Sequence, residues 1–126
     1  MQKKRPIFLQ PAQIRLPVPG IVSIMHRISG LALFVCLPWL LWLFSGTLSK
    51  ESAFECYQAW VHNPLVIIVL ILLLWAFLHH ALAGIRFLFL DIHKGLNLST
   101  ARTTAKSVLV VEFILLIIIV GACWLS

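Results

Sequence analysis

Long apolar runs, separated by short polar stretches, make up most of the sequence. Three of these runs, at about residues 21–45, 64–91 and 105–125, contain very few charged side chains. Each is long enough to cross a hydrocarbon layer of about 30 Å at about 1.5 Å of helical rise per residue. Because lipid cannot satisfy exposed backbone groups, each run is expected to be a helix. The pattern predicts an all-α membrane protein with three transmembrane helices.

Proline positions indicate how the rest of the chain is organised. Residues 1–20 contain several prolines and are expected to form an extended arm rather than a continuous helix. Residues 21–126 are expected to form one three-helix transmembrane domain. Pro38 is predicted to bend the first helix, and Asn63 followed by Pro64 is a start signal for the second.

Composition and charge agree with a membrane protein and predict its orientation. The chain is 61% hydrophobic and only 11% charged, which excludes an ordinary soluble domain. The net charge of +6 comes largely from basic residues before the first helix and around the second connection. By the positive-inside rule, the N-terminus is cytoplasmic and the C-terminus is periplasmic. This orientation accounts for the basic residues, so they do not indicate a nucleic-acid-binding protein. Five aromatic residues lie toward the predicted outer surface and agree with the orientation: Trp39, Trp42, Tyr57, Trp60 and Trp124.

Four residues of the first predicted helix form one stripe near its cytoplasmic end: Ser23, His26, Arg27 and Gly30. Polar side chains at this depth are costly and call for a partner or a function. An isolated Arg27 could simply extend toward the lipid headgroups. Its companions Ser23 and His26 favour a binding role instead.

Two faces of the second predicted helix carry polar residues. One face holds His80, Gly84, Phe87 and Asp91, with the last three within about 40° of His80. His79 and Arg86 share a different face. The small residues beside His80 would let a flat macrocycle approach the backbone while the imidazole binds its iron. The alternative is a histidine that hydrogen-bonds a neighbouring helix.

The depth of His80 relates it to the stripe on the first helix. His80 lies eleven residues before Asp91, which corresponds to about 16 Å of helix below the cytoplasmic end. A haem standing upright on His80 would direct its propionates toward His26 and Arg27. Equally, Ser23 and Arg27 could donate hydrogen bonds to a quinone carbonyl.

Two motifs resemble a known family. The chain reads "SIMHRISG" on the first predicted helix and "HHALAGIRFLFLD" on the second. In this order, and over nearly the whole chain, they resemble the large cytochrome b membrane-anchor subunit of bacterial succinate dehydrogenase. The resemblance implies that His80, four residues before "GIR", is an axial ligand of haem b. It also implies that a second, smaller anchor subunit supplies the other axial histidine.

The resemblance also implies roles for other polar residues. Ser23 and Arg27 would line a ubiquinone site, and His26 with Arg27 would lie near a haem propionate. Asp91 would belong to the edge of the pocket, paired with Arg27 or Arg86, and Gly84 would line the haem pocket. Family members often read "GIRH", whereas this chain has Phe87 at the last of these positions.

Two further polar residues have no role in the family pattern. Adjacent helical residues point about 100° apart, so His79 and His80 cannot both bind one iron from the same side. His80 matches the motif and is therefore the expected ligand. Glu112, in the third predicted helix, is expected to pair with Lys106 or with a partner helix, and a proton relay is the less favoured alternative.

The function implied is that of one subunit of succinate:ubiquinone oxidoreductase, respiratory complex II, in the bacterial inner membrane. The chain would have no catalytic residue and no activity alone. A flavoprotein would oxidise succinate, and an iron–sulfur subunit would pass electrons to ubiquinone. Two alternatives are an anchor subunit of a fumarate reductase and a structural anchor without haem. A transporter is disfavoured because the sequence shows neither repeats nor broken helix pairs.

Overall fold

The computed structural model describes residues 16–48 and 51–125, which contain helices and no strand. These helices are α1 (Val18–Thr47), α2 (Glu51–Val61), α3 (Pro64–Asp91) and α4 (Leu98–Leu125). The three long helices α1, α3 and α4 are apolar enough to cross a membrane. The expectation of an all-helical chain with three apolar spans is therefore confirmed, and α2 is an addition to it. Most of the predicted N-terminal arm lies outside the described residues.

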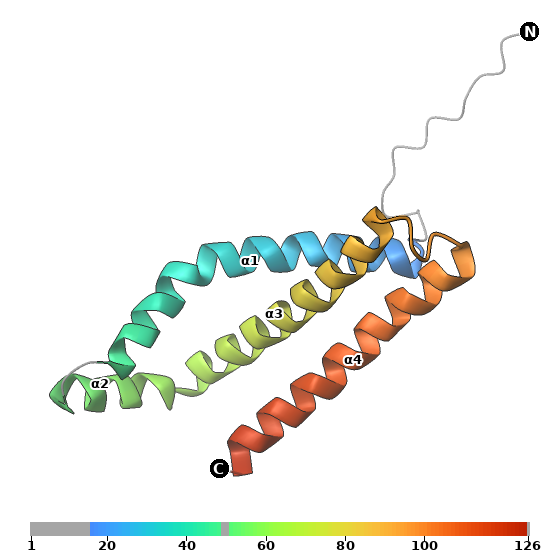
Figure 1. Cartoon of the computed structure of the whole chain (residues 1–126). Helices are drawn as coiled ribbons and strands as arrows, with labels where there is room; N and C mark the ends of the chain where they lie inside the picture. Colours follow the sequence, from blue (N-terminus) through green and yellow to red (C-terminus); the bar gives the residue numbers. More distant parts are fainter. Residues whose placement is uncertain (1–15, 49–50, 126) are drawn as a thin grey trace, which may run out of the picture.

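The start of α1 shows how helix and proline coexist. α1 begins at Val18, so the last residues assigned to an extended arm are helical. Pro17 is the N-cap residue and Pro19 lies in the first turn, where backbone N–H groups have no partner within the helix and proline costs little. Farther along, Pro38 lies inside α1, which is visibly bent (Figure 1).

The ends of α3 follow local rules. Its start agrees with the prediction: the Asn63 side chain accepts a hydrogen bond from the Leu65 N–H at 2.9 Å, and proline follows the cap. At its end, His93 adopts a left-handed conformation, with φ of 60°. The Lys94 N–H then bonds the carbonyl of Phe89 at 3.0 Å, which is the pattern of a Schellman cap.

The fourth helix starts earlier than predicted. α4 begins at Leu98, whereas the apolar run indicated about residue 105. Hydropathy marks the part of a helix that lies in lipid and says little about polar turns beyond it. Here the polar turns are helical, and the Thr103 hydroxyl donates to the Ser99 carbonyl at 3.0 Å within the same helix.

The short helix α2 packs against the end of α1. A Cβ atom added to Gly46 would lie 2.7 Å from the Tyr57 ring, so α2 approaches the α1 backbone closely. The rings of Trp42 and Trp60 meet edge to face at 5.6 Å. Figure 1 shows α2 and the C-terminus at one end of the molecule and the α3–α4 connection at the other. Two of the aromatic residues expected at the outer surface therefore lie in contact at the end formed by α2.

Helix α3 lies between α1 and α4 (Figure 1), and it contacts both. Many large apolar side chains point outward, among them Leu31, Phe34 and Ile117, as expected for a surface that faces lipid. A small cluster fills the junction of the three long helices: Val22, Ala83, Ala105 and Val108. Among the residues whose burial the structure describes, four polar ones are also buried: Ser29, His79, Arg86 and Glu112. Burial of polar groups at helix contacts is the feature that defines the candidate site.

Candidate functional site

Helices α1 and α3 approach each other closely at Gly30 and His80. A Cβ atom on Gly30 would lie 2.7 Å from Cε1 of His80, closer than ordinary contacts permit. Only glycine at this position lets the imidazole lie against the α1 backbone. Ser29 is buried beside it, with its hydroxyl 3.4 Å from Nδ1 of His80.

A hydrogen bond fixes the tautomer of His80. Its Nδ1 lies 3.0 Å from the backbone carbonyl oxygen of His26, and this oxygen can only accept. Nδ1 therefore carries the proton, and in the neutral ring Nε2 keeps its lone pair. The Ser29 hydroxyl donates to the same carbonyl at 2.9 Å. The arrangement presents Nε2 of His80 as a ligand atom.

The His26 side chain fixes the plane of the His80 ring. The two imidazoles are stacked, with centroids 4.2 Å apart and planes 6° from parallel. Phe87 packs edge-on against His26 at 5.1 Å, and a Cβ atom on Gly84 would lie 3.5 Å from Nε2 of His26. The predicted sharing of one face by His80, Gly84 and Phe87 is thus confirmed, because all three surround His26.

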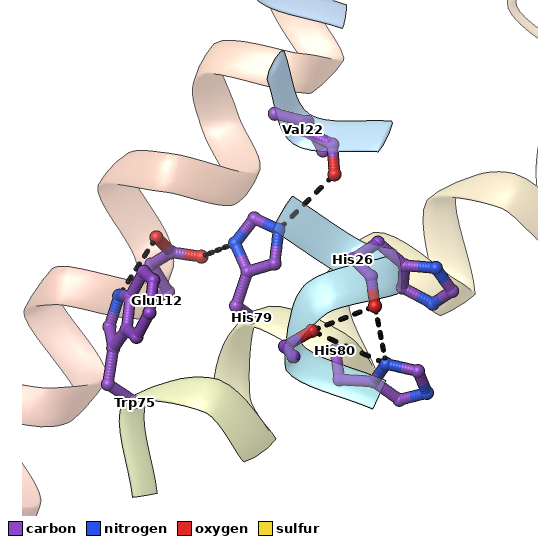
Figure 2. A network of polar contacts seen from close by, with 7 residues as sticks. Val22, His26, Trp75, His79, His80 and Glu112 are labelled. Atoms are coloured by element: carbon purple, nitrogen blue, oxygen red, sulfur yellow. Dashed lines mark hydrogen bonds and ion pairs between the residues drawn. The ribbon is translucent and has the colours of Figure 1, made fainter. Parts of the chain in front are cut away.

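His79 points away from His80 and into the protein (Figure 2). His79 and Glu112 are both fully buried, and Nδ1 of His79 lies 2.5 Å from Oε2 of Glu112. Nε2 of His79 lies 3.4 Å from the carbonyl oxygen of Val22, and the indole N–H of Trp75 donates to Oε1 of Glu112 at 3.3 Å. Of the two expected pairings of Glu112, the one with Lys106 is wrong, because Lys106 is exposed, whereas Glu112 turns inward and pairs with a neighbouring helix, α3.

Arg86 joins α3 to α4. Its Nε donates to the Thr104 hydroxyl at 3.1 Å and its Nη2 donates to the Ala101 carbonyl at 3.1 Å. Arg86 is buried, as is His79, so the predicted second face of α3 exists and packs against α4. Asp91 is exposed, and within residues 16–48 and 51–125 the structure records no ion pair between it and Arg86.

Known proteins resemble this chain over nearly its whole length. Residues 1–119 match the family described as succinate dehydrogenase/fumarate reductase transmembrane subunit. A succinate dehydrogenase cytochrome b556 subunit of Coxiella burnetii is 36% identical over 119 residues, which is 94% of this chain and 95% of that protein. The subunit of the same name from Paracoccus denitrificans is 32% identical, over 90% of this chain and 88% of that protein. A third subunit of this name, from Rickettsia bellii, is 31% identical over 92% of this chain and 90% of that protein.

The chain belongs to this family. It is a multi-pass membrane protein of the succinate dehydrogenase/fumarate reductase transmembrane subunit family, and its three apolar helices agree with that membership. In the structure, the residues expected at the site lie in two groups. His26, Gly84 and His80 lie together between α1 and α3. Ser23 and Arg27 form the second group, on α1, where Ser23 is half-buried and Arg27 is exposed.

Two residues of the site, Ser29 and Trp75, were given no role from the sequence. Ser29 belongs to the motif "SIMHRISG" and lies three residues after His26, so helical spacing could have placed it on the same face of α1 as His26. Trp75 lies four residues before His79, and the same spacing brings their rings to 5.9 Å. Its bond to Glu112 depends on how α4 packs, which no spacing within α3 predicts.

Proposed function

We propose that this chain is the cytochrome b membrane anchor of a bacterial succinate dehydrogenase, respiratory complex II, in the inner membrane. The observation that carries the proposal is the fixed tautomer of His80, which leaves Nε2 free of a proton on the side of α3 that faces His26 of α1. The family description includes fumarate reductases. The three relatives described above are all named for succinate dehydrogenase, which favours electron flow from succinate to quinone.

The residues present fit a b-type haem. Nε2 of His80 would be the iron ligand, while the carbonyl of His26 and the hydroxyl of Ser29 hold the opposite side of the ring. Haem, when bound, supplies reversible one-electron transfer. His26 and His80 are stacked side by side, so they cannot reach one iron from opposite sides. This supports a second axial histidine from a second, smaller anchor subunit.

We assign ubiquinone binding to Ser23 and Arg27, with Asp91 at the edge of the pocket. Both α1 residues lie within the same two turns as His26, and Arg27 is exposed, so its guanidinium is available to a ligand. A donated hydrogen bond would stabilise negative charge that develops on a quinone oxygen during reduction. Arg27 and His26 would also lie beside a haem propionate.

The partner subunits follow from this assignment. A flavoprotein would oxidise succinate and an iron–sulfur protein would deliver electrons to the quinone, so this chain is inactive alone. The polar stripe of α1 lies at the end of the molecule that carries the α3–α4 connection. We place this end at the cytoplasmic face, where the iron–sulfur subunit would dock, because basic residues concentrate there.

Replacement of the ligand tests the haem assignment. In the complex assembled with its partner subunits, His80→Ala should reduce haem retention by at least about tenfold. Loss of a metal ligand lowers the affinity for the metal at least as much as loss of a group that supports the ligand. The reduced-minus-oxidised difference spectrum of purified complex measures this. His62→Ala, an exposed histidine at the end of α2, is the control. An unchanged spectrum in His80→Ala would contradict the assignment and favour a purely structural anchor.

Replacement of Arg27 tests the quinone assignment. Arg27→Leu should lower ubiquinone reduction by about a hundredfold, the usual effect of removing one donor to developing charge. Succinate oxidation by a soluble artificial acceptor should remain, since that reaction needs only the partner subunits. Arg102→Leu, which changes an exposed arginine of α4, is the matched control. Equal quinone turnover in both variants would rule out the role of Arg27.

A further inference from the structure

A second polar cluster lies on a different face of α3 from the one that contacts His26. We call Val22, Trp75, His79 and Glu112 the His79 network; Figure 2 shows it beside His80. It joins all three long helices, because Val22 belongs to α1, His79 to α3 and Glu112 to α4. Its two ionisable side chains are fully buried, which is rare inside a membrane protein without a task.

The hydrogen bonds of the network determine how it holds its protons. The Val22 carbonyl can only accept, so Nε2 of His79 donates to it. A further proton lies between Nδ1 of His79 and Oε2 of Glu112. The pair is neutral as a whole, whether it is imidazolium with carboxylate or imidazole with carboxylic acid. Both nitrogens of His79 are thus used by the protein, unlike those of His80.

The two adjacent histidines are coupled through the geometry of α3. Side chains at successive helical positions point about 100° apart, so the direction of one fixes the direction of the other. His79 is held by α4 through Glu112 and by α1 through the Val22 carbonyl. A rotation of α3 that moved His80 away from the His26 carbonyl would also pull His79 out of these contacts.

We propose that the His79 network is a positioning device that sets the rotation of α3 and thereby directs Nε2 of His80 to its iron. His79 and Glu112 act only through His80 and do not bind the haem. The α1 helix is held at two carbonyls one turn apart, that of Val22 by His79 and that of His26 by His80. This inference rests on the proposed haem-binding function of His80.

Substitutions at Glu112 test the inference in the assembled complex. Glu112→Leu removes both carboxyl oxygens of the network and should shift the midpoint potential of the haem and weaken its retention by about tenfold, as for other groups that orient a metal ligand. Glu112→Gln keeps an acceptor for Trp75 and a donor for Nδ1 of His79, so it should restore the potential and spectrum. Val108→Ala is the matched control, because Val108 is buried one turn earlier on α4.

A milder variant keeps the test decisive if Glu112→Leu does not assemble. Trp75→Phe removes one hydrogen bond to Glu112 and should move the haem potential in the same direction by a smaller amount. The inference would be overturned if Glu112→Leu or Trp75→Phe assembled with a haem potential and spectrum equal to those of the unsubstituted complex. Such a result would leave the proposed function intact if His80→Ala still loses haem. Equal shifts in Val108→Ala and Glu112→Leu would also overturn it, because general loosening of α4 would then explain them.

Discussion

At the scale of single residues, the chemistry of the two neighbouring histidines depends on their acceptors. His80 bonds a backbone carbonyl through Nδ1, which leaves Nε2 with a lone pair. His79 contacts a carboxylate and a carbonyl, so both of its nitrogens are engaged. The geometry therefore suits His80 to the proposed role of iron ligand, whereas His79 is a contact between helices.

Gly30 offers a sharp test at this scale. In Gly30→Ala the new methyl group would displace the imidazole of His80, because its Cε1 lies 2.7 Å from the added atom. We expect loss of the bond between Nδ1 and the His26 carbonyl, worth about 1 kcal/mol, and a changed haem spectrum. Gly121→Ala is the control, since no atom lies within 4 Å of its added Cβ. Identical spectra in the two variants would contradict the close contact of Gly30 with His80.

Spacing along one helix predicted much of the site. The angle of 100° per residue separated the face of His80, Gly84 and Phe87 from that of His79 and Arg86. It could not predict the partner of Glu112, because that contact depends on how far α4 is rotated against α3. Long-range pairing of this kind requires the packed structure.

At the scale of helices, apolar runs predicted the cores of the spans better than their ends. The start of α3 was predicted correctly because Asn63 and Pro64 act locally, through a side-chain cap and a fixed backbone angle. The early start of α4 was missed because helical hydrogen bonds continue into polar sequence. Helix α2 was missed because its contacts with Gly46 and Trp42 are tertiary.

At the scale of the whole molecule, Lys94 and the paired tryptophans Trp42 and Trp60 lie at opposite ends. The α3–α4 connection and the start of α1 lie at one end, and α2 with the C-terminus lies at the other (Figure 1). Lys94 marks the first end and the paired rings of Trp42 and Trp60 mark the second. This distribution supports the proposed orientation, with the α3–α4 connection in the cytoplasm.

Cysteine labelling tests this orientation. Cys56 is exposed on α2, so a membrane-impermeant maleimide should label it in intact spheroplasts that carry Cys36→Ala and Cys123→Ala. Lys94→Cys, made in a chain whose native cysteines are all replaced by alanine, should be labelled only after the membrane is broken, because positive residues stay inside. The reverse accessibility would invert the orientation and place the quinone site on the periplasmic side.

The position of Pro38 divides α1 into parts with different freedom to change. All the polar contacts of α1 with α3 described above involve residues before it, namely Val22, His26 and Ser29. Beyond it, the contacts described are those of Trp42 and Gly46 with α2. Substitutions in the distal half of α1 can therefore accumulate over evolution, or be introduced by protein engineers, while the surroundings of His80 stay as they are.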